Sequence, residues 1–380
     1  MTNIALQTFS GSHHEIGVQQ GKAVRELIQQ VLEQIPSFED IKLMKPRLLP
    51  TSLFLALAKR RAAKLLRNDI FECYPEQAER LRGIAEGAGI DVPTILFMQS
   101  IELLKITESD YRLQACTSLG FSPQRTVTAE TIVAKNFDYP NAYEFYHLTC
   151  RTNPTGRYRT LGCTMAPLPG MLDGMNEHGL TVTYNLANTT DKPKYFVPLS
   201  IVLQEMLETC KDTEEAVKFM INAKRGGHDA ILMLADAEGN VKTVEISPNH
   251  AATREMVGDQ IINPNHYLTA EMQQYEIPHN AVLYGKAIPK DRQGVRLHES
   301  SEQRLKRAQA LLKTKAKIDE NKIVTVLRDH GKDNKPSMLT ICRHDKYSST
   351  LRSMIFYPNR KTMKVLYGKP CQNEYVEFTF

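Results

Sequence analysis

The feature that most constrains the fold is a change of pattern near residue 116. From about residue 14 to residue 112 apolar side chains recur near every 3.6 residues, as at Val24, Leu27 and Val31, a spacing that predicts helices. Pro75 stands where a helix tolerates proline best, in its first turn. A further helix is expected from about residue 92 to residue 105. After residue 116 short β-branched runs alternate with turn residues, which predicts strands.

The second part of the chain mixes strands with pairs of helices. Strands are expected at residues 131–137, 158–164, 180–187, 230–235, 241–246 and 353–357, and helices near residues 198–209, 213–223, 301–313 and 319–328. Asp212, with Glu215 three residues later, predicts the cap of the second helix. This order favours an α+β fold in which two antiparallel sheets carry helices on their outer faces. We expect a helical N-terminal segment, residues 1–115, and a layered catalytic domain, residues 116–380.

Composition and charge exclude several classes of protein. The 380 residues are 42% hydrophobic, enough for a substantial core. The net charge of +5 is small for this length, and the basic clusters lack interleaved aromatic residues, so no nucleic-acid partner is expected. The first residues are polar, without an apolar core of signal-peptide length, and the longest apolar stretch is too short to cross a bilayer. We therefore expect a cytoplasmic enzyme with no membrane partner.

The cysteine pattern argues against a fold held together by disulfide bonds or by a metal ion. Seven cysteines are present, an odd number, widely spaced and without any C-x-x-C pair: Cys73, Cys116, Cys150, Cys163, Cys210, Cys342 and Cys371. This spacing fits neither a disulfide framework nor a zinc site. We therefore expect no metal and no cofactor, and mostly reduced, buried thiols.

One cysteine lies at the junction between the two patterns. A thiol is a strong nucleophile but is mostly protonated at neutral pH, so Cys116 needs a base. If the chain is cut before Cys116, the new α-amine, with a pKa of about 8, can be that base. Asp138 closes a run that reads as the return strand of a hairpin starting at Cys116, which would bring the two residues together. Taken alone, such a cysteine is more commonly a core residue and such an aspartate a turn former.

Several motifs occur in an order typical of one enzyme group. They are Gly11-Ser-His-His-Glu-Ile-Gly17, Pro75-Glu-Gln-Ala-Glu-Arg-Leu-Arg-Gly83, Cys116-Thr-Ser, Lys135-Asn-Phe-Asp138, Gly174-Met-Asn-Glu-His-Gly179, Asn263-Pro-Asn265-His266, Ser300-Ser-Glu-Gln-Arg304 and Leu366-Tyr-Gly-Lys-Pro370. With these motifs the chain resembles the acyl-coenzyme A:6-aminopenicillanic acid acyltransferase family, relatives of the choloylglycine hydrolases in the N-terminal-nucleophile superfamily. The resemblance implies a four-layer αββα core and no cofactor.

The resemblance also implies a self-processing mechanism. Cys116 would be the nucleophile, exposed as a new N-terminus by cleavage between Ala115 and Cys116, and Asp138 would hold its amine. Ala115 departs from the glycine of the penicillin enzyme at this position, which puts the efficiency of cleavage in doubt. The two fragments are expected to stay associated.

The same resemblance assigns roles to further polar residues. Asn185 and Asn265 match asparagines that line the oxyanion and substrate site, and Arg304 matches an arginine beside the nucleophile. Lys135 and Asn136 are expected to bind substrate, Lys135 standing where bile-salt hydrolases carry an arginine. The expected substrate is a small N-acyl amide or acyl thioester, with hydrolysis favoured over acyl transfer. No oligomeric state is predicted.

Other interpretations of the same residues remain open. Cys163 is a rival nucleophile, because Gly162-Cys163-Thr164 is closer to the family's local motif than Cys116-Thr-Ser, although no helical segment precedes it. His266 would serve a papain-like Cys-His-Asn hydrolase that works without self-cleavage. A non-catalytic scaffold with this fold is the third interpretation.

Overall fold

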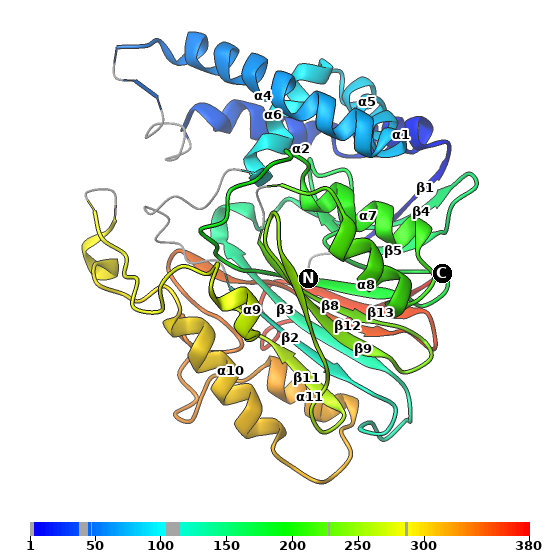
Figure 1. Cartoon of the computed structure of the whole chain (residues 1–380), viewed down its shortest axis with the longest axis vertical. Coiled ribbons are helices and arrows are strands. Elements are labelled where there is room, and N and C mark those ends of the chain that lie inside the picture. Colours follow the sequence, from blue (N-terminus) through cyan, green and yellow to red (C-terminus); the bar gives the residue numbers. More distant parts are fainter. Residues whose placement is uncertain (1–3, 38–44, 47, 104–114, 227–228, 286–287) are drawn as a thin grey trace.

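Two stacked β-sheets with helices on both outer faces form the core of the protein (Figure 1). A computed structural model describes residues 4–37, 45–46, 48–103, 115–226, 229–285 and 288–380 of the chain. The expected α+β class and its αββα layering are confirmed. The predicted helical end at residues 104–105 and the residues just before Ala115 lie outside the described part.

The smaller sheet contains the hairpin that starts at the candidate nucleophile. Its six strands run in the order β11-β2-β3-β12-β13-β14. Their bounds are β2 Ala115–Phe121, β3 Ile132–Pro140, β11 Gln260–Asn263, β12 Ser348–Tyr357, β13 Thr362–Tyr367 and β14 Val376–Thr379. β2 and β3 pair antiparallel, with Cys116 opposite Phe137 and Ala115 opposite Asp138. The expected hairpin is therefore confirmed.

The larger sheet has eight strands in the order β1-β4-β5-β6-β7-β8-β9-β10. Their bounds are β1 Leu6–Gly11, β4 His147–Pro154, β5 Thr160–Met165, β6 Asp173–Asn176, β7 Thr181–Leu186, β8 Ala230–Ala235, β9 Val241–Ile246 and β10 Ala251–Arg254. β1 belongs to the N-terminal segment and pairs in parallel with β4. Local patterning did not indicate β1, because only Phe9 of its six side chains is buried.

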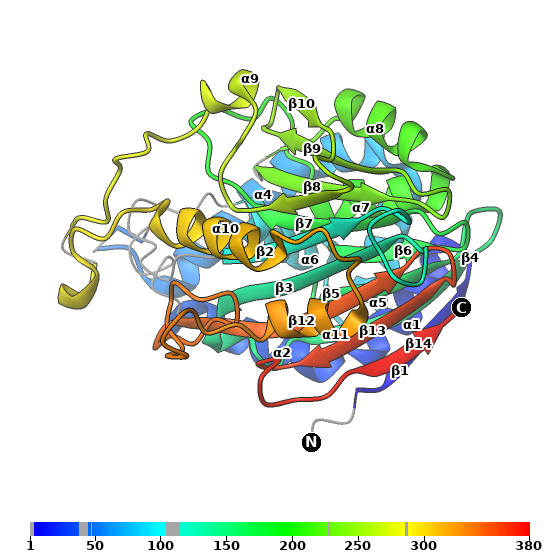
Figure 2. The same ribbon diagram turned by 90° about the horizontal axis from the view of Figure 1, so that it is seen from below.

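Helices cover the outer face of each sheet. α7 (Leu199–Thr209) and α8 (Thr213–Asn222) lie on the larger sheet, whereas α10 (Glu299–Leu312) and α11 (Glu320–Leu327) lie on the smaller one (Figure 2). Asp212 caps α8 as predicted, its carboxylate accepting from the Glu215 N–H at 2.9 Å. Shorter elements are η2 (Asn141–Tyr143), α9 (Ala270–Gln273) and η3 (Lys290–Arg292).

The N-terminal helices pack on the α7 side of the core (Figure 1). They are α1 (His13–Ala23), α2 (Arg25–Gln34), η1 (Ile35–Ser37), α4 (Thr51–Cys73), α5 (Pro75–Ala88) and α6 (Val92–Leu103). α1 and α5 cross in close contact at glycines: a Cβ at Gly17 would lie 2.1 Å from the Arg80 carbonyl oxygen, and one at Gly83 would lie 2.1 Å from that of His14. The two glycine-containing motifs therefore form one helix-helix contact.

None of the helices in the described ranges combines the length and apolar character needed to cross a membrane.

Candidate active site

Strand alternation directs Cys116 toward the space between the two sheets. Ser118, two residues further along β2, donates its hydroxyl to Asn185 Oδ1 on β7 of the other sheet at 2.6 Å. Side chains two apart on a strand share a face, so the Cys116 thiol lies on this inter-sheet face. Only 4% of Cys116 is exposed.

Arg304 approaches the same strand from α10, on the opposite face. Its Nη1 donates to the Cys116 carbonyl oxygen and, at 2.7 Å, to Thr117 Oγ1. Its Nη2 donates to Asn265 Oδ1 at 2.8 Å. Burial lowers the pKa of Arg304, while the charges of Asp138 and Cys116 raise it. A 1%-exposed guanidinium therefore holds the backbone of the candidate nucleophile directly.

Asn265 connects three segments that are distant in sequence. Its Oδ1 accepts from the Cys116 backbone N–H at 2.7 Å as well as from Arg304. Its Nδ2 donates to the Leu186 carbonyl oxygen at 2.7 Å, and its own backbone N–H donates to Ser301 Oγ at 2.7 Å. The side chain is thus fixed against the nitrogen of the predicted scissile bond.

Asn185 holds the turn that carries Asn265. Its Nδ2 donates to the backbone carbonyls of Asn263 and Pro264, at 2.8 and 3.1 Å, and its Oδ1 accepts from Ser118. In the uncut chain both N–H groups of this amide are therefore engaged with the backbone. The geometry supports a positioning role for Asn185 in this state.

Asp138 is a fully buried carboxylate with one unsatisfied oxygen. Its Oδ1 accepts from Thr350 Oγ1 at 2.6 Å, whereas Oδ2 has no hydrogen-bond partner among the described residues. Burial raises the pKa of Asp138 to about 6, and the nearby Arg304 and Arg343 guanidiniums oppose that rise. The site therefore has room for one more positive or hydrogen-bonding group at this carboxylate.

The thiol itself is not activated in the uncut chain. Burial raises the pKa of Cys116, more than the Lys135 charge and a hydrogen bond from the Asp138 backbone N–H lower it. A thiol in this environment needs a base to become nucleophilic.

The two residues predicted to bind substrate have internal partners. Lys135, fully buried, donates from Nζ to Asp173 Oδ1 at 2.6 Å and to the Tyr184 carbonyl. Asn136 donates to the carbonyls of Leu327 and Ile341, at 2.8 and 2.9 Å. These contacts fasten the hairpin to the larger sheet and to the α11 region, so they support positioning roles for both side chains.

The sequence did not single out three residues that complete these contacts. Asp173 pairs with Lys135 and, at 2.8 Å, with Arg352, and it directly precedes the glycine motif at residue 174. Ser301 lies inside the quoted motif that ends at Arg304, which could have indicated it. Thr350 carries no comparable signal, because only the pairing of β12 with β3 brings it to Asp138.

The rival residues have other surroundings. The His266 ring bonds Ser301 Oγ through Nδ1 at 2.7 Å, and burial lowers its pKa to about 4. Cys163 lies on β5 and is fully buried, with its sulfur 3.6 Å from Thr149 Oγ1. Within the described ranges no hydrogen bond joins His266 to Cys116, so the papain-like interpretation has no support from this geometry.

A cavity of about 360 Å³ opens beside β4 and β13. Its lining includes His147, Thr149 and Tyr367. No residue predicted to act in catalysis lines it, so this cavity is not assigned to the substrate.

The fold and the site together define a layered αββα protein with a buried thiol at the second residue of β2. Residues 126–372 match the acyl-coenzyme A:6-aminopenicillanic acid acyl-transferase family. The match covers more than half of the chain, and the protein belongs to this family, as its motifs predicted. It is therefore an enzyme of the acyltransferase or amidohydrolase type, acting on C–N bonds. The match begins ten residues after Cys116, so it does not include the candidate nucleophile.

Solved structures with a similar arrangement are distant in sequence. An N-acylethanolamine-hydrolyzing acid amidase ortholog from Caenorhabditis elegans is 16% identical, with 64% of this chain and 93% of that chain covered and a TM-score of 0.44. A mutant of conjugated bile acid hydrolase from Clostridium perfringens is 15% identical, with 70% of this chain and 97% of that chain covered and a TM-score of 0.45. Penicillin V acylase from Agrobacterium tumefaciens is 15% identical, with 67% of this chain and 83% of that chain covered and a TM-score of 0.42. Among curated proteins, none matches the chain.

Proposed function

We propose that the protein is a self-processing cysteine amidohydrolase or acyltransferase that acts on small N-acyl amides or acyl thioesters through an acyl-enzyme at Cys116. The family supports a reaction at an acyl amide or thioester, and the geometry of the site supports Cys116 as the nucleophile. The observation that carries the proposal is the set of contacts on the Cys116 backbone. Asn265 accepts from its N–H, Arg304 donates to its carbonyl oxygen, and the Asp138 carboxylate, with one unsatisfied oxygen, belongs to the residue opposite Ala115.

Self-cleavage would proceed by an acyl shift within the chain. The Cys116 sulfur attacks the Ala115 carbonyl carbon and loses its proton, and the C–N bond breaks as the nitrogen is protonated, leaving a thioester. Water then hydrolyses the thioester, which yields an Ala115 carboxylate and a Cys116 residue with a free thiol and α-amine. The products balance without any metal or oxidant.

Cleavage would provide a partner for the unsatisfied oxygen of Asp138. The α-amine created at Cys116 has a pKa of about 8 and is largely protonated at neutral pH. An ammonium beside Asp138 would add a positive charge to those of Arg304 and Arg343 and would give the unsatisfied Oδ2 a hydrogen-bond donor. In turn the carboxylate would hold the amine near the sulfur, where the neutral amine can accept the thiol proton during substrate attack.

The N-terminal segment is expected to remain bound after cleavage. β1 forms six register pairs with β4 in the larger sheet, and buried residues of α1 and α5 belong to the same core cluster as those of the sheet. Separating the fragments would therefore remove a strand and expose apolar surface, at about 25 cal/mol for each Å² uncovered.

Hydrolysis and transfer share the acyl-enzyme and differ in the group that removes the acyl chain. The family name describes transfer of an acyl group from a thioester to an amine, which supports both substrate classes. We favour hydrolysis, because water needs no dedicated acceptor site.

A substrate panel tests this proposal. Purified protein is offered N-acyl amines, N-acyl amino acids, acyl thioesters and an unfolded protein, with Cys116→Ala as the inactive variant and Cys163→Ala as the matched cysteine control. We expect the wild type and the Cys163→Ala variant to turn over at least one small acyl compound, and the Cys116→Ala variant to turn over none. Turnover of the unfolded protein with every small compound untouched, or full activity of Cys116→Ala, would contradict the proposal.

A further inference from the structure

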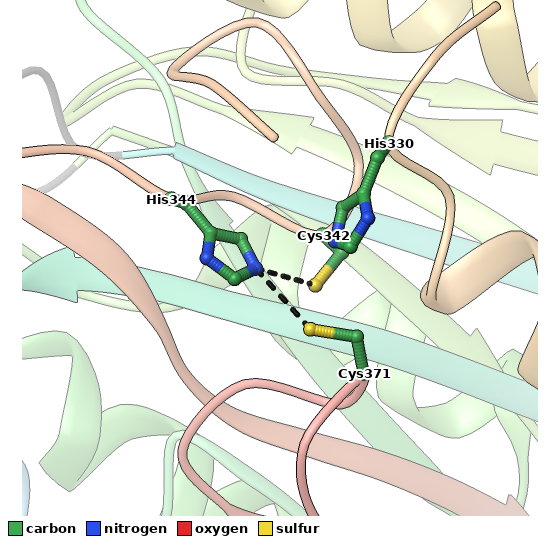
Figure 3. Close-up of side chains that lie close together, drawn as sticks. All are labelled: His330, Cys342, His344 and Cys371. Carbon is green, nitrogen blue, oxygen red and sulfur yellow. Dashed lines mark hydrogen bonds between the residues drawn. The ribbon is translucent and has the colours of Figure 1, made fainter. Parts of the chain in front are cut away.

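Two cysteines and two histidines meet outside the candidate active site. His330, Cys342 and His344 lie in the loop between α11 and β12, and Cys371 lies in the turn after β13. Their donor atoms all lie within 4.8 Å of one another. Figure 3 shows the His344 ring directed at both sulfurs, with His330 beside Cys342.

The two separations between the His344 ring nitrogen and the sulfurs are close to those of a tetrahedral zinc site. With Zn–S near 2.3 Å and Zn–N near 2.05 Å, tetrahedral geometry places sulfur and nitrogen about 3.5 Å apart and two sulfurs about 3.8 Å apart. His344 Nε2 lies 3.4 Å from Cys342 Sγ and 3.3 Å from Cys371 Sγ. Small side-chain adjustments would therefore suffice to bind the ion.

The donor set is one that zinc prefers. Two thiolates and two neutral imidazoles make the Cys₂His₂ combination of structural zinc sites. Each thiol would lose its proton on binding the ion as a thiolate.

His330 gives an independent indication of a missing partner. Its Nε2 is buried and has no hydrogen-bond partner in the described part of the chain, and its ring packs edge-on against His344 with centroids 5.0 Å apart. A buried ring nitrogen without a partner is costly, and a metal ion in this group would give it one.

The loop that carries three of these residues also supports Asp138. The backbone N–H of Arg343, between Cys342 and His344, donates to Thr350 Oγ1 at 2.9 Å. The same hydroxyl donates to Asp138 Oδ1 at 2.6 Å. Fixing the loop would therefore fix a hydrogen-bond chain that ends at the candidate active site.

We propose that His330, Cys342, His344 and Cys371 form a structural zinc site that joins the α11–β12 loop to the turn after β13. The two loops come from segments on either side of the β12–β13 pair. The ion would act as a cross-link between them and stabilise the folded chain by binding it and not the unfolded one.

Metal analysis of the full-length protein tests the site. The protein is purified in reducing buffer, incubated with zinc and freed of unbound ion, and bound zinc is measured by mass spectrometry of the elements. We compare wild type, Cys371→Ser and Cys73→Ser, a partly buried cysteine on α4 that lies outside the group. We expect one zinc per chain in wild type and Cys73→Ser, and at least a tenfold lower content in Cys371→Ser.

A second measurement does not depend on the variant folding. In the wild-type chain, zinc should protect the partly exposed Cys371 from alkylation and leave Cys73 reactive, and cobalt should give the visible absorption of a tetrahedral thiolate complex. Zinc-free wild type after incubation, an unchanged zinc content in Cys371→Ser, or a Cys342–Cys371 disulfide in the purified protein would each overturn the proposal.

Discussion

Replacing Asp138 by asparagine in an uncleavable chain should change how stability depends on pH. Burial raises the pKa of Asp138 from 3.8 to about 6, so the folded uncut chain holds this proton more tightly than the unfolded chain does. The stability that the carboxyl contributes is complete below pH 4 and is lost as pH rises through 6. A shift of roughly two units at about 1.36 kcal/mol each gives a loss of about 3 kcal/mol.

The comparison uses Cys116→Ala and Cys116→Ala/Asp138→Asn, because neither can form the α-amine. Urea unfolding of both is measured at pH 4 and at pH 7.5, and the free energies of unfolding are subtracted at each pH. Between pH 4 and pH 7.5 we expect the free energy of unfolding of the asparagine variant to rise by about 2.4 kcal/mol relative to that of the aspartate variant. A difference that does not change with pH, or that changes in favour of aspartate, would refute the account of Asp138 as a carboxyl whose pKa is raised by burial.

Three further predictions concern the site and the helix crossing. Arg304→Lys keeps the positive charge but loses the simultaneous contacts with Cys116, Thr117 and Asn265, so the rate of self-cleavage should fall at least about tenfold. The rate is measured by gel densitometry during folding of the chain. Cleavage at the wild-type rate would show that Arg304 has no part in self-cleavage. Asp138→Asn should leave a folded protein whose kcat on a small acyl amide is at least about tenfold lower, because the α-amine loses its partner; an unchanged kcat would exclude this role. Gly83→Val would force a Cβ to within 2.1 Å of the His14 carbonyl oxygen, and should lower the free energy of unfolding by about 2 kcal/mol or more; equal unfolding curves would show that α1 and α5 do not cross as described.

The local patterns of the sequence predicted the layers and the hairpin well. A continuous apolar run indicated β8, and a run rich in β-branched residues indicated β9, both with their observed bounds; the Asp212 cap indicated the start of α8. These features depend on residues close together in the chain. The order of motifs indicated Arg304 and Asn265, and the structure brings both to Cys116.

Long-range pairing could not be predicted in the same way. β1 is a short edge strand with one buried side chain, so its place depends on β4, more than 130 residues later. Lys135 was expected to meet substrate, yet its partner Asp173 lies on the other sheet. The four donors of the proposed zinc site span residues 330–371 without a C-x-x-C pair, and only the packing of two loops brings them together.

The most direct test of the central claim is the mass of the purified wild-type protein and the N-terminal sequence of its largest fragment. The account predicts two associated fragments, the larger of which begins at Cys116, and a single intact chain for Cys116→Ala prepared in the same way. An active wild-type enzyme that remains one uncut chain, or cleavage of Cys116→Ala at the same bond, would contradict self-processing by Cys116.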